Sequence, residues 1–125
     1  MSENQAVRMQ SQTLWNRIAA LPIGPAGASL TFRQRLAREN AWSPTFADKV
    51  VFEYRRFIYL AAISDHAVTP SDQVDQAWHL HLTHTRSYWK DLCEGILGFA
   101  LHHHPTQGGV DQQRKFKRQY IHTLS

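Results

Sequence analysis

The spacing of apolar residues constrains the fold of this chain more than any other feature. These residues recur at three- and four-residue intervals, and no stretch alternates apolar and polar residues over the length of a strand. The first spacing places apolar side chains on one face of an α-helix, whereas alternation is typical of a half-buried strand. The chain has 125 residues, which is the size of one ordinary domain. We therefore expect a single all-α domain.

Start signals divide the domain into about five helices. Ser43-Pro44 is such a signal, because a serine side chain accepts hydrogen bonds from free backbone N–H groups and proline fits the first helical position. The run 69–72 repeats this pattern, and Ser29 or Thr31 can cap another helix. We expect a compact bundle of about five helices with a histidine-bearing loop between the last two. The expected helices cover about 9–20, 32–40, 44–62, 72–94 and 110–123.

The helix expected over about 44–62 has the longest apolar face of the chain. Its apolar residues recur at three- and four-residue spacing, while charged residues occupy wetter positions between them. A long helix with one apolar face is expected at the centre of a helical core. The apolar positions are Phe46, Val50, Tyr54 or Phe57, Leu60 and Ala61.

Composition excludes several classes of protein. The longest apolar run, 57–63, is far shorter than the roughly 20 residues of a membrane-spanning helix, and the N-terminus lacks a secretory signal. The single cysteine, Cys93, cannot form a disulfide within the chain or a four-thiolate zinc site. We therefore expect a soluble cytoplasmic protein without membrane insertion, in which any metal is bound by histidines and carboxylates.

The charge of the chain gives little support to nucleic-acid binding. Fourteen basic and ten acidic residues give a net charge of +4, which is mild. Residues 114–118 contain four basic side chains, for which a solvated helix face is the simpler interpretation. The sequence also has no nucleotide or flavin signature. Nucleic acid is therefore not the expected partner.

The main functional signal is a cluster of histidines. The chain has eight, and six of them fall between residues 79 and 104. The triplet 102–104 is internal and is followed by Pro105, so it is not an expression tag. A histidine-rich stretch is a compositional hint of metal binding, and its geometry decides whether the hint is useful.

A helical wheel separates the histidines of the fourth expected helix. Asp75 and His79 are four residues apart and lie one turn above the other, whereas His81 falls on the apolar face beside Trp78. Residues two apart diverge by about 200°, so His79 and His81 cannot bind one ion from the same regular helix. Asp75 with His79 is the better carboxylate–imidazole pair, and His81 with His84 is the alternative.

Two protein ligands are insufficient for a tight metal site, so a third has to come from another segment. The loop at 102–104 is the only nearby stretch that offers imidazole groups without also offering a hydrophobic alternative. We expect Zn or Fe at an Asp/His site that combines one helix with this loop, with His81 as the next candidate. The candidate metal ligands are Asp75, His79, His81, His102 and His103.

Each candidate also has a structural interpretation. Asp75 and His79 can form an ordinary interaction of a helix surface. His81 can be a buried histidine that is satisfied by a hydroxyl or carbonyl group. The loop histidines can pin their loop to the helix without a metal, and Cys93 is expected to be a buried structural thiol.

Several short runs of the chain match a known pattern. They are E-Y-R-R-F at 53–57, V-T-P-S at 68–71, D-x-x-W-H-x-H at 75–81, and L-H-H-H-P-T at 101–106. On these runs the chain resembles the glycine-rich domain-containing-protein-like family over roughly 32–124, and D-x-x-W-H-x-H is the specific part. The resemblance implies signature positions at Asp75, Trp78, His79, His81, His102 and His103, with a variable position at His104.

The resemblance implies a family-like core over 29–125, preceded by an N-terminal helix and loop over 1–28. It implies no particular activity. The chain lacks the glycine-rich tail of the plant members, and it ends at Ser125 where similar bacterial proteins continue with another helical stretch.

These observations favour a small metal-binding domain. If it is an enzyme, an ion with an unfilled position would activate water or oxygen for hydrolytic or oxidative chemistry, with Tyr88 or His81 transferring protons. The alternative is a metal-free module whose helical surface docks a protein partner. A third class is a helical domain that associates weakly with nucleic acid through its basic C-terminal residues.

Overall fold

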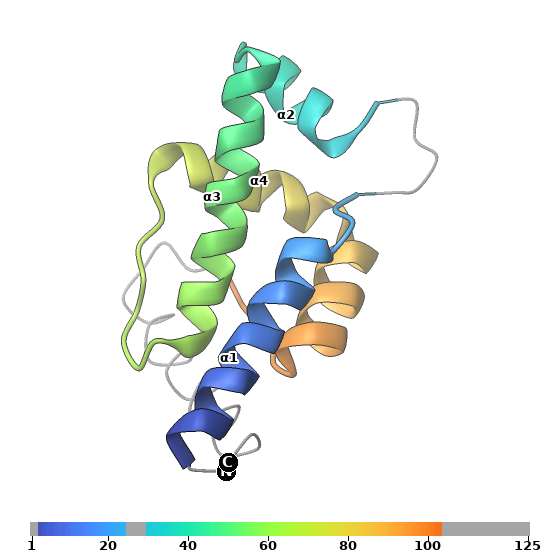
Figure 1. The fold of residues 1–125 in the computed structure, drawn as a ribbon. Coiled ribbons are helices and arrows are strands. Elements are labelled where there is room, and N and C mark those ends of the chain that lie inside the picture. Colours follow the sequence, from blue (N-terminus) through green and yellow to red (C-terminus); the bar gives the residue numbers. More distant parts are fainter. Residues whose placement is uncertain (1–2, 25–29, 104–125) are drawn as a thin grey trace.

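The computed structural model describes residues 3–24 and 30–103, which form a bundle of helices (Figure 1). No strand occurs among these residues, which confirms the all-α expectation. The helix expected near the C-terminus lies outside the described residues. The elements are α1 (Glu3–Ala20), α2 (Phe32–Asn40), α3 (Pro44–Ile63), α4 (Asp72–Thr83) and the π-helix η1 (Arg86–Leu97).

Side-chain caps set the starts of three helices. Thr31, Ser43 and Ser71 stand just before α2, α3 and α4, and each accepts a hydrogen bond from the backbone N–H three residues further along. Thr31 is therefore the cap of α2, in place of the alternative Ser29. Each such cap satisfies one free N–H and contributes about 1 kcal/mol to stability.

Helix α3 is the centre of the bundle, as its long apolar face predicts. It contacts α1, α2 and α4 (Figure 1). The prediction of a core position is wrong for two of its residues, because Phe46 and Leu60 are 40% and 41% exposed. Phe46 packs on Trp42 at the end of the helix, and Leu60 stands about 120° around the helix from Tyr54. The buried residues of α3 are Ala47, Val50, Tyr54, Phe57, Ile58, Ala61 and Ala62.

The fourth expected helix is interrupted, and the expectation of one continuous helix to about residue 94 is wrong. In a regular helix the Leu80 carbonyl would accept from the His84 N–H. Here that carbonyl accepts from the Thr83 hydroxyl at 2.6 Å and lies 3.0 Å from Nδ1 of His84, while the His84 N–H bonds to the His81 carbonyl. Side chains that compete for a backbone acceptor are a known cause of helix disruption.

Beyond the interruption the chain winds as a π-helix. Its buried residues Tyr88, Leu92 and Leu97 are spaced by four and five positions, which suits the wider turn of i to i+5 hydrogen bonding. The Gly98 N–H closes the helix on the Cys93 carbonyl, with Gly98 at φ 79°. That left-handed conformation favours glycine. Gly95, which directly follows the helix expected over 72–94, lies inside η1.

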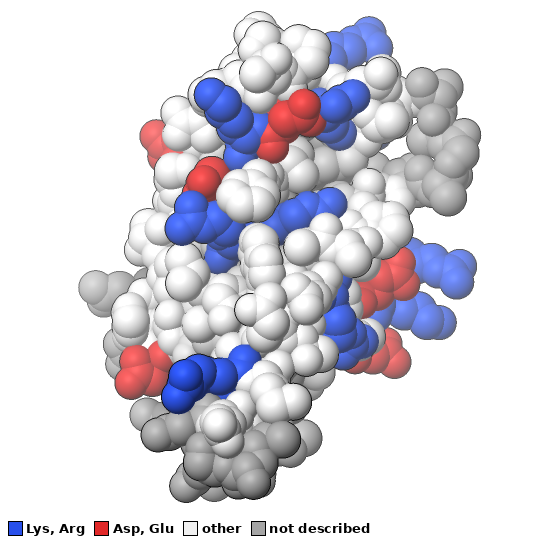
Figure 2. All heavy atoms as spheres, viewed as in Figure 1, with Lys and Arg blue, Asp and Glu red and all other residues white. Residues whose placement is uncertain are grey.

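The face shown in Figure 2 carries acidic side chains among basic ones. Exposed ion pairs between such side chains contribute little to stability, about 0–1 kcal/mol each. None of the helices in the described ranges combines the length and apolar character needed to span a membrane. Exposed ion pairs among the described residues include Arg33–Asp48, Arg35–Glu39 and Arg56–Glu53.

Candidate metal centre

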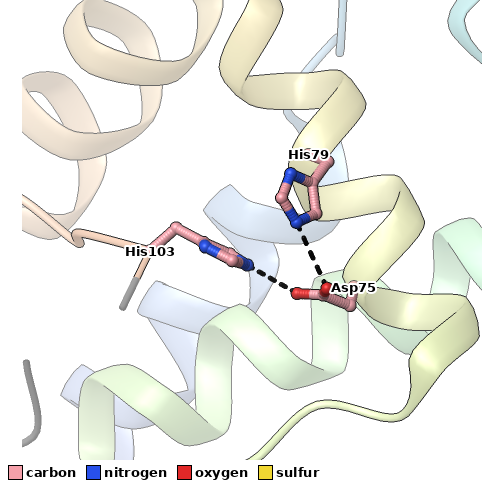
Figure 3. Close-up of side chains that lie close together, drawn as sticks. All are labelled: Asp75, His79 and His103. Atoms are coloured by element: carbon pink, nitrogen blue, oxygen red, sulfur yellow. Dashed lines mark hydrogen bonds and ion pairs between the residues drawn. The ribbon is translucent and has the colours of Figure 1, made fainter. Parts of the chain in front are cut away.

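Helix α4 places Asp75 and His79 on one stripe of its surface. The two residues are four apart, and Nε2 of His79 lies 3.3 Å from Oδ2 of Asp75 (Figure 3). The side chain of His79 is 56% exposed, while that of Asp75 is 32% exposed. The pair is therefore formed by the helix itself and faces solvent on the His79 side.

His103 reaches the same carboxylate from the segment that follows η1 (Figure 3). Its Nε2 donates a hydrogen bond to Oδ1 of Asp75 at 2.6 Å. The imidazole is only 16% exposed, with its ring centre 4.5 Å from that of Trp78 and 4.3 Å from that of His79. One carboxylate thus joins two imidazoles, one through each of its oxygens.

A buried hydroxyl fixes the segment that carries His103. The Tyr88 hydroxyl accepts a hydrogen bond from Nε1 of Trp78 at 2.8 Å and donates one to the Leu101 carbonyl. Tyr88 and Leu101 are fully buried. These bonds tie helix α4, helix η1 and the chain two residues before His103 to one another, so the position of His103 is set by the core.

The three side chains form a group that can hold a metal ion. One ligand atom from each of Asp75, His79 and His103 lies within 4.8 Å of the other two. Ligands around a tetrahedral ion at about 2.0–2.1 Å stand roughly 3.4 Å apart, so the 2.6 Å contact of His103 is a hydrogen bond that has to open slightly to admit an ion. Two imidazoles and one carboxylate match sites that bind Zn or Fe(II).

His81 is not brought to this group. It is fully buried, with Nδ1 2.7 Å from the Tyr54 hydroxyl and Nε2 3.0 Å from Oγ of Ser87. Burial, and to a lesser extent the nearby His84 and Arg55, lowers the pKa of His81 to about 3. Both nitrogens are therefore used by hydroxyl groups in a neutral ring, the arrangement of a structural histidine.

His102 also lies apart from the group. Its ring packs against Trp89, with the ring centres 5.3 Å apart. Of the two loop histidines that the sequence favours, only His103 reaches Asp75 in the described structure. The His102 ring contacts Trp89, whereas the His103 ring contacts Trp78.

Cys93 and Tyr88 belong to the core. Cys93 is a free, buried thiol, and burial raises its pKa to about 11. Burial also raises the pKa of Tyr88 far above its ordinary value, with a smaller contribution from Cys93. The Tyr88 hydroxyl is engaged by Trp78 and Leu101. The expected proton-transfer groups, Tyr88 and His81, therefore both lie within the core.

Spacing along the sequence predicts the Asp75–His79 pair, but it predicts neither the partners of His81 nor the contact of Trp78 with His103. Tyr54 lies 27 residues from His81 on another helix, and no local spacing links them. Trp78 was recognisable as an aromatic residue one position before His79, but its contact with His103 depends on the path of the chain after η1. Contacts between distant segments carry no periodic signal.

A family model matches residues 29–123, a range that includes Asp75, His79 and His103. The chain belongs to the UCP032817-like family. The description of the UCP032817-like family names no activity, so the match shows a relationship without a reaction. No curated protein and no solved structure matches the chain.

Proposed function

We propose that this UCP032817-like domain is a metal-binding domain whose ion is held by Asp75, His79 and His103. The observation that carries the proposal is the meeting of three possible ligand atoms, from two separate segments, within 4.8 Å of one another. The two nitrogens that face Asp75 are both Nε2 atoms. An ion can thus replace the proton that now joins imidazole and carboxylate.

The support around the site suits a metal centre better than a chance surface contact. The His103 ring is held between Trp78 and His79, and the chain before it is tied to Tyr88 through the Leu101 carbonyl. Metal sites depend on such outer contacts to orient their ligands. A site that orders two segments also couples metal binding to the stability of the fold.

The donor set points to Zn or Fe(II). Catalytic zinc sites have three protein ligands from histidines and carboxylates, and two histidines with one carboxylate also bind non-haem Fe(II). Such an ion would supply Lewis-acid activation of water or, for iron, of oxygen. Asp75, His79 and His103 would hold it, and Trp78 would close the inner side.

Elemental analysis of untagged protein tests the proposal. We expect about one metal ion per chain in the wild type and its loss in His79→Ala and His103→Ala. His102→Ala is the matched control, because it removes the neighbouring imidazole, which packs on Trp89, and should retain the ion. A folded, metal-free wild type that takes up neither Zn²⁺ nor Fe²⁺ would overturn the proposal.

A metal-free interaction module is the second candidate, and one observation favours it. Helix α3 exposes several large apolar side chains, which a protein partner would cover. This function predicts normal folding without metal and a specific partner in a pull-down that Phe52→Ser abolishes. The exposed residues are Phe46, Phe52, Leu60 and Ile63, at 38–51%.

Three further expectations concern the family, the compartment and the partners of the protein. The D-x-x-W-H-x-H run still relates the chain, in our proposal, to glycine-rich domain-containing proteins. A reduced, buried Cys93 suits a soluble protein of the cytoplasm. The face shown in Figure 2 mixes acidic and basic side chains, and this face does not favour nucleic acid as a partner. The basic run 114–118 lies outside the described residues.

A further inference from the structure

We infer that an ion held by Asp75, His79 and His103 keeps a coordination position on its solvent side, and that this position takes a small anion with an oxygen donor, such as a carboxylate. The inference rests on the proposed metal site and deepens it by naming the class of ligand. It follows from the burial of the three ligands, their number and their charge.

Burial differs across the site. The His103 side chain is 16% exposed and lies against Trp78, whereas the His79 side chain is 56% exposed. Asp75 stands between them at 32%. An ion among these groups is therefore closed on the Trp78 side and open on the His79 side, so a further ligand has to approach from solvent.

The number of ligands among the described residues leaves a position free. Structural zinc sites are closed by four protein ligands, whereas sites with three keep a position for water or another exogenous ligand. Within the described ranges, the group around Asp75 contains three His, Cys, Asp or Glu residues. Asp72, one turn earlier on α4, is not among them. Water would fill the free position until a better ligand displaces it.

The charge of the centre selects an anion. A divalent ion with one carboxylate and two neutral imidazoles carries a net charge of +1, and a monoanion neutralises it. Zn²⁺ and Fe²⁺ both accept carboxylate oxygens at about 2.0–2.2 Å. Because Trp78 closes the inner side, the anion is expected to bind through its oxygen while the rest of the ligand stays in solvent.

Cobalt substitution tests this inference, because the visible spectrum of Co²⁺ reports its ligands. The Co²⁺-loaded wild type is titrated with acetate and, as a control of the same shape, with neutral acetamide. We expect acetate to shift the visible bands with saturation at one site, and acetamide to leave them unchanged. Elemental analysis of the same samples measures whether the cobalt stays bound.

The outcomes separate the inference from the proposed function. Failure to bind cobalt at the site overturns the metal proposal itself. Cobalt that stays bound while acetate leaves its spectrum unchanged overturns the open position alone. Asp72→Asn is the second check, since a spectrum that changes in this variant would make Asp72 the fourth ligand. The spectrum should also be the same at low and high protein concentration, because a ligand from a second chain would depend on concentration.

Discussion

His79 and His81 are two residues apart on one helix, yet their surroundings differ completely. His79 stands on the outer stripe of α4, more than half exposed, with a carboxylate one turn away. His81 points into the core, where two hydroxyl groups occupy its two nitrogens. The face of the helix, and not the residue type, therefore decides which histidine is available to a ligand.

The interruption of the fourth expected helix affects the surroundings of both His81 and the exposed Asp75–His79 pair. It lets η1 bring Ser87 to Nε2 of His81 and the Tyr88 hydroxyl to Trp78. Beyond η1, the chain then delivers His103 to Asp75. The contacts that follow the interruption therefore include those of the buried His81 and those of the exposed cluster.

Truncating each histidine should separate the two roles most strongly. His81→Ala is expected to lower the free energy of unfolding by about 3 kcal/mol, because it leaves a cavity and removes the partner of the Tyr54 and Ser87 hydroxyls. His79→Ala in metal-free protein should change it by less than about 0.5 kcal/mol. Urea unfolding measures both values. Equal losses in the two variants would contradict the contrast.

Adding metal should stabilise the protein only through the exposed cluster. Zn²⁺ at about 100 times its Kd is expected to raise the free energy of unfolding by about 2.7 kcal/mol. Asp75→Asn should lose this gain, since the carboxylate is shared by both imidazoles. Asp72→Asn, one turn earlier on α4, is the matched control and should keep it. Thermal unfolding with and without Zn²⁺ gives the comparison, and a gain that survives in Asp75→Asn would show that the ion binds elsewhere.

Acid should lower the stability of the folded protein through the buried His81. Its pKa is lowered to about 3 in the folded protein, so below the ordinary value of about 6.5 the unfolded chain binds the extra proton. The contribution of His81 to the free energy of unfolding is fully present above about pH 6.5. It is lost as the pH falls toward 3, by at most about 1.4 kcal/mol per pH unit. Urea unfolding at about pH 7 and about pH 5 measures the loss. His81→Gln should show a smaller loss, and an identical pH dependence would argue against this cause.

The smallest effect is expected at Tyr88, which links the core to the segment that carries His103. Tyr88→Phe removes the hydroxyl that holds the Leu101 carbonyl, and should weaken metal binding about tenfold by loosening the approach of His103. Tyr59→Phe is the matched control, because its ring packs on Trp15 in another part of the bundle. Calorimetric titration with Zn²⁺ on folded protein provides the affinities. Equal affinities in the two variants would remove Tyr88 from the account.

The sequence predicts those parts of the molecule that depend on local patterns. The caps at Ser43 and Ser71, the central place of α3 and the Asp75–His79 pair all follow from short-range spacing. The break at His84 does not, because it results from side chains that compete for one carbonyl. The choice of His103 over His102 depends on the path of the chain after η1, which no periodicity encodes.

Nitrogen NMR of the histidine side chains tests the central claim most directly. On addition of Zn²⁺, the Nε2 resonances of His79 and His103 should move to the position of metal-bound nitrogen, while those of His81 and His102 stay where they are. Spectra in which His81 or His102 takes the metal-bound position, or in which His79 and His103 do not respond, would contradict the account.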